Sequence, residues 1–183
     1  MIAVVALAPV VAATSFAAAR GDRRVVAYLL VWAVLAALVR AVHRRRPLPE
    51  PALLALAAAG AAHLAGGLAP SPDPAAPTLY ETWLVEGVLK YDQLAHASIC
   101  AVVTLAAAHV VARPVTALAV CWGFALANEV FEYVSTLRFD DSYAGGLTNA
   151  GWDLAFNAAG SLAAVAWLVS RPRPPARSPA PAT

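Results

Sequence analysis

Six long apolar stretches, separated by short polar segments, constrain the fold of this chain more than any other feature of its sequence. They cover residues 2–19, 25–42, 51–69, 92–112, 115–137 and 152–170. A helix of ~20 apolar residues crosses the ~30 Å hydrocarbon core of a bilayer, and it satisfies its own backbone hydrogen bonds there. The pattern therefore predicts an all-α fold, a polytopic bundle of about six transmembrane helices.

The composition agrees with this interpretation and excludes other classes of protein. Hydrophobic residues make up 61% of the chain and charged residues only 13%, whereas a water-soluble domain needs more charge to cover its surface. The net charge of +2 is too small to indicate binding to nucleic acid, so the expected partners are membrane lipids. The two cysteines, Cys100 and Cys121, fall inside predicted spans and are expected to be small core residues.

The distribution of basic residues predicts how the chain is oriented. We expect residues 1–170 to form one transmembrane domain, followed by a disordered, cytoplasmic Pro/Arg tail at residues 171–183. If both termini are cytoplasmic, the inner side carries Arg40, Arg44, Arg45, Arg46, Arg113, Arg171, Arg173 and Arg177. The outer side then carries Arg20, Arg23, Arg24, Lys90 and Arg138. The positive-inside rule favours this orientation, although the group at residues 20–24 runs against it.

Two segments of the chain allow alternative interpretations. Residues 2–19 are expected to form a retained helix, and a cleaved signal peptide is the alternative. In residues 78–91, apolar and aromatic side chains recur at helical spacing, and Glu86 and Lys90 are four residues apart. This pattern predicts a short interfacial helix, or else an extension of the fourth span.

Polar side chains recur at helical spacing in three of the predicted spans. The pairs are Asp92 and His96, Glu129 and Glu132, and Asp153 and Asn157. Residues three or four apart share one face of a helix. Because neighbouring spans run in opposite directions, all three pairs fall in the same half of the membrane, which is the outer half in the orientation given above.

Such residues are costly in a membrane and are functional candidates by default. One charged side chain costs ~2.5 kcal/mol or more at the bilayer centre. Glu129 and Glu132 also repel one another, so they need a shared proton, a cation or an arginine partner. The alternative is structural: Asp92 and Asp153 would cap the starts of their helices, and the polar network would hold the helices together.

These residues support a candidate site in which each side chain has a role. A divalent metal could be held by His96, Glu129, Glu132 and Asp153. Asp92 would orient His96 as a general base, and Arg138 could hold an anionic headgroup or phosphate. His63, in the third span, could join the site.

The sequence leaves three functions open for this site. One is an enzyme that acts on lipid or envelope substrates. The second is a protein that binds or transports protons, cations or lipid headgroups. The third is a structural membrane protein without chemistry of its own.

The motifs at residues 91–160 resemble a known family. Tyr91-Asp92 with His96, the Glu129-x-x-Glu132 helix and Trp152-Asp153 are similar, in the same order, to the YjdF-like bacterial inner-membrane proteins. The resemblance implies a membrane fold, a shared polar site and location in the inner membrane, and it implies no established reaction. Asn157 stands where YjdF-like chains often repeat an acid, which weakens the case for a metal ligand at that position.

A weaker similarity links the same motifs to the VanZ-like family. Asp153-x-x-x-Asn157-x-x-Gly160 fits the last element of the VanZ-like pattern, and Arg138 fits its arginine. Glu132 stands where VanZ-like chains have glutamine, which favours the YjdF-like family.

Overall fold

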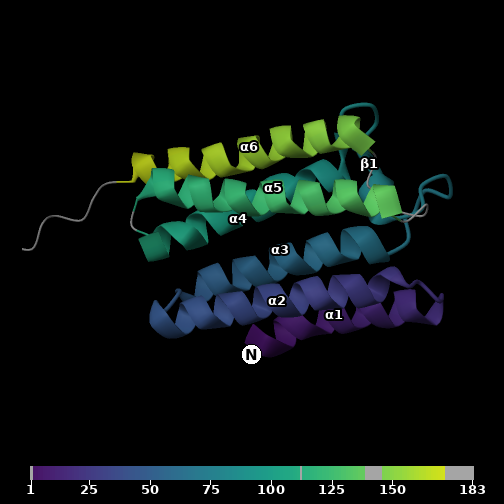
Figure 1. Ribbon diagram of the computed structural model, residues 1–183, viewed down its shortest axis with the longest axis horizontal. Coiled ribbons are helices and arrows are strands. Elements are labelled where there is room, and N and C mark those ends of the chain that lie inside the picture. Colours follow the sequence, from purple (N-terminus) through teal and green to yellow (C-terminus); the bar gives the residue numbers. More distant parts are fainter. Residues whose placement is uncertain (1, 112, 139–145, 172–183) are drawn as a thin grey trace, which may run out of the picture.

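The described part of the chain forms six long helices, as the apolar stretches predict. The computed structural model describes residues 2–111, 113–138 and 146–171. The helices are α1 (Ile2–Ala19), α2 (Arg24–Arg45), α3 (Glu50–Leu68), α4 (Tyr91–Val111), α5 (Pro114–Arg138) and α6 (Gly146–Ser170). They run back and forth along one direction (Figure 1). The all-α membrane bundle is therefore confirmed, and most helix ends lie within three residues of the predicted ones.

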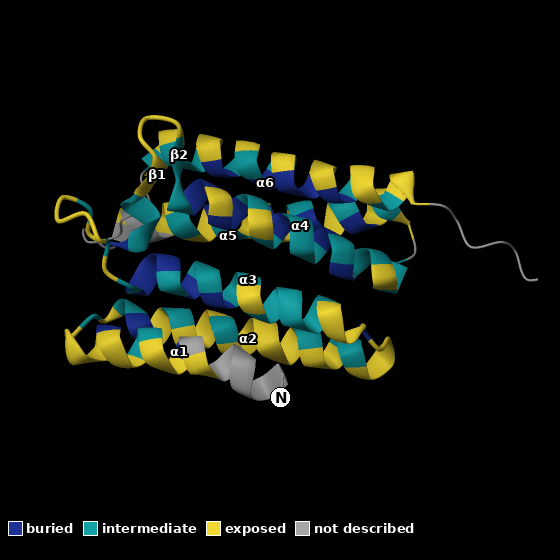
Figure 2. Cartoon of the chain, turned by 180° about the vertical axis from the view of Figure 1, so that it is seen from behind, coloured by how far each residue is buried: buried dark blue, intermediate teal, exposed yellow. Residues whose placement is uncertain are grey.

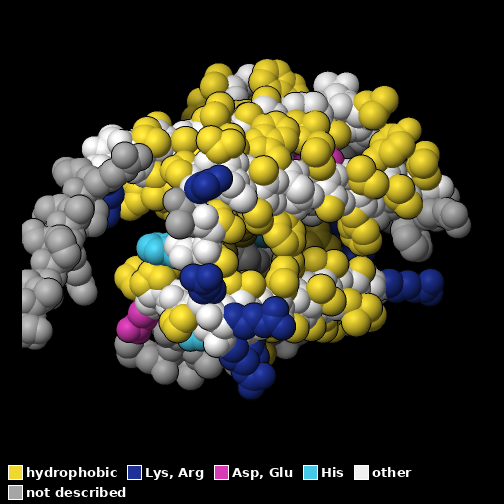
Figure 3. Space-filling view, turned by 60° about the vertical axis from the view of Figure 1, so that its left-hand side comes forward, with side chains coloured by type: hydrophobic (Ala, Val, Ile, Leu, Met, Phe, Trp, Pro, Cys, Tyr) yellow, Lys and Arg dark blue, Asp and Glu magenta, His cyan; other side chains and the backbone are white. Residues whose placement is uncertain are grey.

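Five of the described helices, α2 to α6, are long and apolar enough to cross a membrane, and the chain is a multi-pass membrane protein. The described part of α1 adds a shorter apolar helix, Val10–Ala19. Apolar side chains cover much of the face of the bundle that Figure 3 shows. In α2 only Val25 is buried, and most of the other leucines and valines of this helix are exposed (Figure 2). This arrangement suits a lipid surround, where exposed apolar residues carry no cost.

Helix α4 is central to the half of the molecule that carries the polar pairs. It packs against α3, α5 and α6, while α1 packs against α3. A Cβ atom placed at Gly160 of α6 would collide with the backbone carbonyl of Ala97 in α4. The glycine thus allows the two helix backbones to approach closely, as small residues commonly do in membrane bundles.

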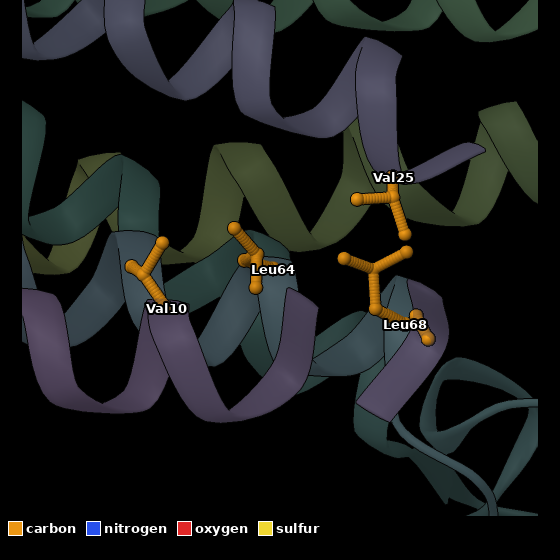
Figure 4. Close-up of a cluster of buried hydrophobic side chains, with 5 residues drawn as sticks. Val10, Val25, Leu64 and Leu68 are labelled. Carbon is orange, nitrogen blue, oxygen red and sulfur yellow. The ribbon is translucent and has the colours of Figure 1, made fainter. Parts of the chain in front are cut away.

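The N-terminal helices are joined by a separate apolar cluster. Val10 of α1, Val25 of α2 and Leu64 and Leu68 of α3 are all buried in it (Figure 4). In Figure 4, Val25 and Leu68 face one another across the gap between their helices. This contact fixes the turn between α1 and α2 against the end of α3.

The segment before α4 is a small hairpin, so both predictions for residues 78–91 are wrong. It contains the 3-10 turn η1 (Leu79–Glu81) and the antiparallel strands β1 (Trp83–Val85) and β2 (Leu89–Lys90). Gly87 adopts a positive φ of 67°, which a glycine allows at little cost. The turn reverses the direction of the chain. Lys90 therefore pairs with Glu81, whose carboxylate oxygen lies 2.8 Å from the Lys90 Nζ atom, and not with Glu86 as its helical spacing indicated.

Helix α6 begins at Gly146, six residues before the predicted start at residue 152. Asp153 therefore lies about two turns inside the helix, and the prediction that it caps the helix start is wrong. Helix α5 ends at Arg138. The side chain of Arg138 is not among the parts that the structure describes, and neither are Asp140 and Asp141, so the predicted role of Arg138 stays a prediction. Of the predicted tail, only Arg171 is described.

Candidate functional site

Helix α4 contributes Asp92 and His96, both buried. The Asp92 Oδ1 atom lies 3.4 Å from Nε2 of His96, across one turn of the helix. Gln93 accepts a hydrogen bond from the backbone N–H of Lys90 at 2.9 Å, which satisfies a donor at the helix start. The Asp92 carboxylate faces His96, while Gln93 makes the capping contact.

Helix α5 contributes Glu129 and Glu132. An oxygen of Glu129 lies 3.5 Å from Nδ1 of His96, so the imidazole stands between the carboxylates of two helices. Asn128 donates a hydrogen bond of 2.8 Å to Glu132. This contact holds the second glutamate on the side of α5 that carries Glu129.

Helix α6 contributes Asp153 and Asn157, which are both fully or almost fully buried. Asn157 donates to Glu129 at 3.4 Å and accepts a hydrogen bond from the Cys100 thiol at 3.0 Å. Asn149 donates to both Asp153 and, at 3.3 Å, Asp92. Asn149 was not identified from the sequence, although its spacing of four residues from Asp153 is a signal that could have found it.

Four of these side chains meet at one point, and we refer to His96, Glu129, Glu132 and Asp153 as the α4–α6 cluster. One nitrogen or carboxylate oxygen from each lies within 4.8 Å of the others. They are the same four residues for which the sequence predicted a metal. The cluster sits toward the end of the bundle that carries the hairpin (Figure 1). The predicted pairs on separate helices are therefore brought together in space.

Among the described residues, His96 is the one basic side chain paired with the carboxyl groups around the α4–α6 cluster. Three carboxyl groups surround one imidazole, and within the described residues no lysine or arginine forms an ion pair with them. Glu129 Oε2 and Asp153 Oδ1 are buried and have no hydrogen-bond partner among the described residues. Buried charges of this kind must be paired, protonated or bound to a metal.

One imidazole and three carboxylates are ligands that suit a divalent cation such as Mn²⁺, Fe²⁺ or Zn²⁺. Imidazole nitrogen suits zinc and iron, and carboxylate oxygen suits manganese and magnesium, so a mixed set favours Mn²⁺, Fe²⁺ or Zn²⁺. His96 presents Nδ1 to Glu129 while Nε2 faces Asp92. An Asp–His pair of this type orients a metal-ligating imidazole and raises its basicity.

His63 of α3 lies beside the cluster, as the sequence suggested. Its ring centroid is 5.7 Å from that of His96, and its Nδ1 atom is buried without a partner among the described residues. The Tyr80 hydroxyl donates to the His63 carbonyl at 2.7 Å. Burial raises the pKa of Tyr80 well above its usual value of 10, so this hydroxyl keeps its proton. This hydrogen bond joins the segment before α4 to helix α3 beside the site.

Comparison with known proteins identifies a family for nearly the whole chain. The family described as "Predicted membrane protein (DUF2238)" matches residues 1–173. Searches of curated proteins and of solved structures found no match. The family match covers the motifs on which the similarity to YjdF-like proteins rests, and it gives no support to the similarity to VanZ-like proteins.

Proposed function

The chain belongs to the DUF2238 family of predicted membrane proteins, and we propose that it binds a divalent cation at the α4–α6 cluster. The observation that carries this proposal is the convergence of His96, Glu129, Glu132 and Asp153, whose ligand atoms lie within 4.8 Å of one another. Four ligating side chains from three helices are enough to hold one ion. Glu129 Oε2 and Asp153 Oδ1 are buried without a hydrogen-bond partner in the described part of the chain, which supplies a reason for the ion to bind.

The surroundings of the cluster favour chemistry at the ion over simple storage. A bound divalent metal lowers the pKa of a coordinated water and polarises a phosphoryl or carbonyl oxygen. Asp92 would hold the His96 ring in place, and Asn157 would hold the Glu129 carboxylate. We infer that the protein is a membrane-embedded enzyme that acts on a polar lipid or envelope substrate.

The location of the site follows from the same proposal. The α4–α6 cluster lies toward the end of the bundle opposite the C-terminal end of α6 (Figure 1). With both termini in the cytoplasm, as the charge distribution favours, this end faces outward across the inner membrane. We infer that the DUF2238 family is the same family as the YjdF-like proteins, since both have a membrane fold and the match spans the shared motifs.

Elemental analysis of the detergent-purified protein tests the proposal. We expect about one Mn²⁺, Fe²⁺ or Zn²⁺ per chain after purification in metal-supplemented buffer, and loss of that metal in His96→Ala and Glu129→Gln. His109→Ala, at an exposed position of the same helix α4, and Glu50→Gln, at an exposed position of α3, are matched controls that should keep the metal.

The other possible metal contents are also informative. A folded wild-type protein that binds no metal would refute the proposal and favour protonated carboxyl groups that bind or move protons. Variants that lose stability in proportion to any loss of function would instead support a purely structural network, because Glu129 belongs to a set of hydrogen bonds that joins α4, α5 and α6.

A further inference from the structure

The C-terminal end of α2 carries four exposed arginines, at the end of the bundle away from the α4–α6 cluster (Figure 1). We refer to them as the α2 arginine patch, which consists of Arg40, Arg44, Arg45 and Arg46. Glu50 is the only acidic residue between Asp22 and Asp73 in the sequence, so four positive charges face one negative charge. Figure 3, in which this end of the bundle comes forward, shows basic side chains gathered there.

The charge of the α2 arginine patch is not balanced within the described part of the chain. None of its guanidinium groups forms an ion pair there. Basic residues in the last turn of a helix interact favourably with its dipole, which accounts for Arg44 and Arg45 but not for Arg40, a turn earlier. Arg40 and Arg44 are four residues apart, and like charges at this spacing destabilise a helix. An anion bound between them would remove that repulsion.

The turn that follows the patch is held in one conformation. The backbone N–H of Leu48 donates to Nδ1 of His43 at 3.0 Å, and the N–H of Arg46 donates to the Val42 carbonyl at 2.8 Å. Leu48 is itself buried, and Pro49 has a restricted backbone. Because the backbone is already ordered, binding of a ligand to the arginines costs little further loss of conformational entropy.

The depth of the patch is that of lipid headgroups. Helix α2 has 22 residues, about 33 Å at ~1.5 Å per residue, which slightly exceeds the ~30 Å hydrocarbon core. Arg40 lies ~7.5 Å before the helix end, and its long side chain can extend to the membrane surface. At the same end of the bundle, the Arg171 guanidinium lies 3.5 Å from the centre of the Trp167 ring, and tryptophan is typical of the interface.

The helix face that continues from the patch toward the middle of α2 is apolar and exposed. Ala37, Ala33 and Leu29 lie three, seven and eleven residues before Arg40, a spacing that keeps them on one face with it. All three are exposed. The two alanines are small, so an extended hydrocarbon chain can lie close to the helix. The face thus combines cations at the interface with apolar surface below them, and an anionic phospholipid has the complementary arrangement.

We propose that the α2 arginine patch binds an anionic phospholipid, with its phosphate at Arg40 and Arg44 and its acyl chains along α2. Guanidinium groups bind phosphate oxygens through paired, charge-assisted hydrogen bonds. Clusters of basic residues at the end of a transmembrane helix attract anionic lipids. The patch shares no residue with the α4–α6 cluster, so this proposal does not depend on metal binding there.

Calorimetric titration of the full-length protein in non-ionic detergent tests the proposal with three probes. They are short-chain phosphatidylglycerol, short-chain phosphatidylcholine and glycerol phosphate, an anionic headgroup without chains. We expect saturable binding of phosphatidylglycerol, weakened about fivefold by Arg40→Gln or Arg44→Gln and about 25-fold by the double variant. Arg23→Gln removes one exposed arginine from the other end of α2 and should bind as the wild type does.

The proposal is overturned if phosphatidylglycerol binds no more tightly than phosphatidylcholine, if the double variant binds as the wild type does, or if Arg23→Gln is weakened equally. Glycerol phosphate that binds as tightly as phosphatidylglycerol would also overturn it, because the acyl chains would then contribute nothing. Both substituted arginines are exposed and outside any ion pair of the described residues, so the variants should fold. Since detergent imposes no orientation, lost binding reports contact with lipid and not an effect on topology.

Discussion

Replacing Gly160 by alanine should destabilise the bundle, because the backbones of α4 and α6 approach closely there. The new Cβ would collide with the backbone C, O and Cα atoms of Ala97, and backbone atoms cannot turn aside as a flexible side chain can. Overpacking of this kind costs ~1–3 kcal/mol. Alanine also favours the helix by ~1 kcal/mol over glycine. This gain offsets part of the collision cost in the measured free energy of unfolding of Gly160→Ala alone.

Gly123→Ala in α5 provides the control that isolates the collision. A Cβ at Gly123 would meet no atom within 4 Å, so this variant should gain the helix propensity alone. The difference between the two variants should then be ~1–3 kcal/mol, measured by reversible unfolding in mixed micelles. Ala97 follows His96 directly, so Gly160→Ala should also weaken metal binding. Equal stability of the two variants would refute the close packing of α4 and α6.

Two further substitutions test the contacts around the site. Asp92→Asn should weaken metal affinity ~10–100-fold, because Asp92 orients His96, whereas Asp73→Asn in an exposed loop should leave the affinity unchanged in competition with a chelating dye. Tyr80→Phe removes the hydroxyl that donates to the His63 carbonyl and should lower the free energy of unfolding by ~1 kcal/mol. Full stability of that variant would show that the hydrogen bond contributes nothing.

The helices could be predicted from the sequence because the apolar stretches match the bilayer thickness. The start of α6 was missed, since Gly146, Asn149 and Gly151 interrupt the apolar run just where the helix begins. The hairpin was missed for a different reason. Its residues carry a helical spacing, but the positive φ of Gly87 and the pairing of Trp83 with Lys90 override it.

The sequence predicted the members of the candidate site, because it places the three polar pairs at one level of the membrane, but it did not predict the contacts between their helices. Helical spacing places Asp92 beside His96 without any knowledge of the fold. Which helices meet is decided by tertiary packing, so His63 could be named only as one possible neighbour of the site. The hydrogen bond from Asn149 to Asp92 could not be predicted from spacing at all.

X-ray absorption spectroscopy of the metal-loaded protein tests the central claim most directly. The α4–α6 cluster offers one imidazole and three carboxylates, so we predict a shell of nitrogen and oxygen at ~2.0–2.2 Å. The imidazole signal should disappear in His96→Gln. Cys100 lies close by, with its sulfur 3.0 Å from Asn157, so a sulfur shell is the natural rival. Sulfur at ~2.3 Å, or an imidazole signal that survives His96→Gln, would contradict the proposed site.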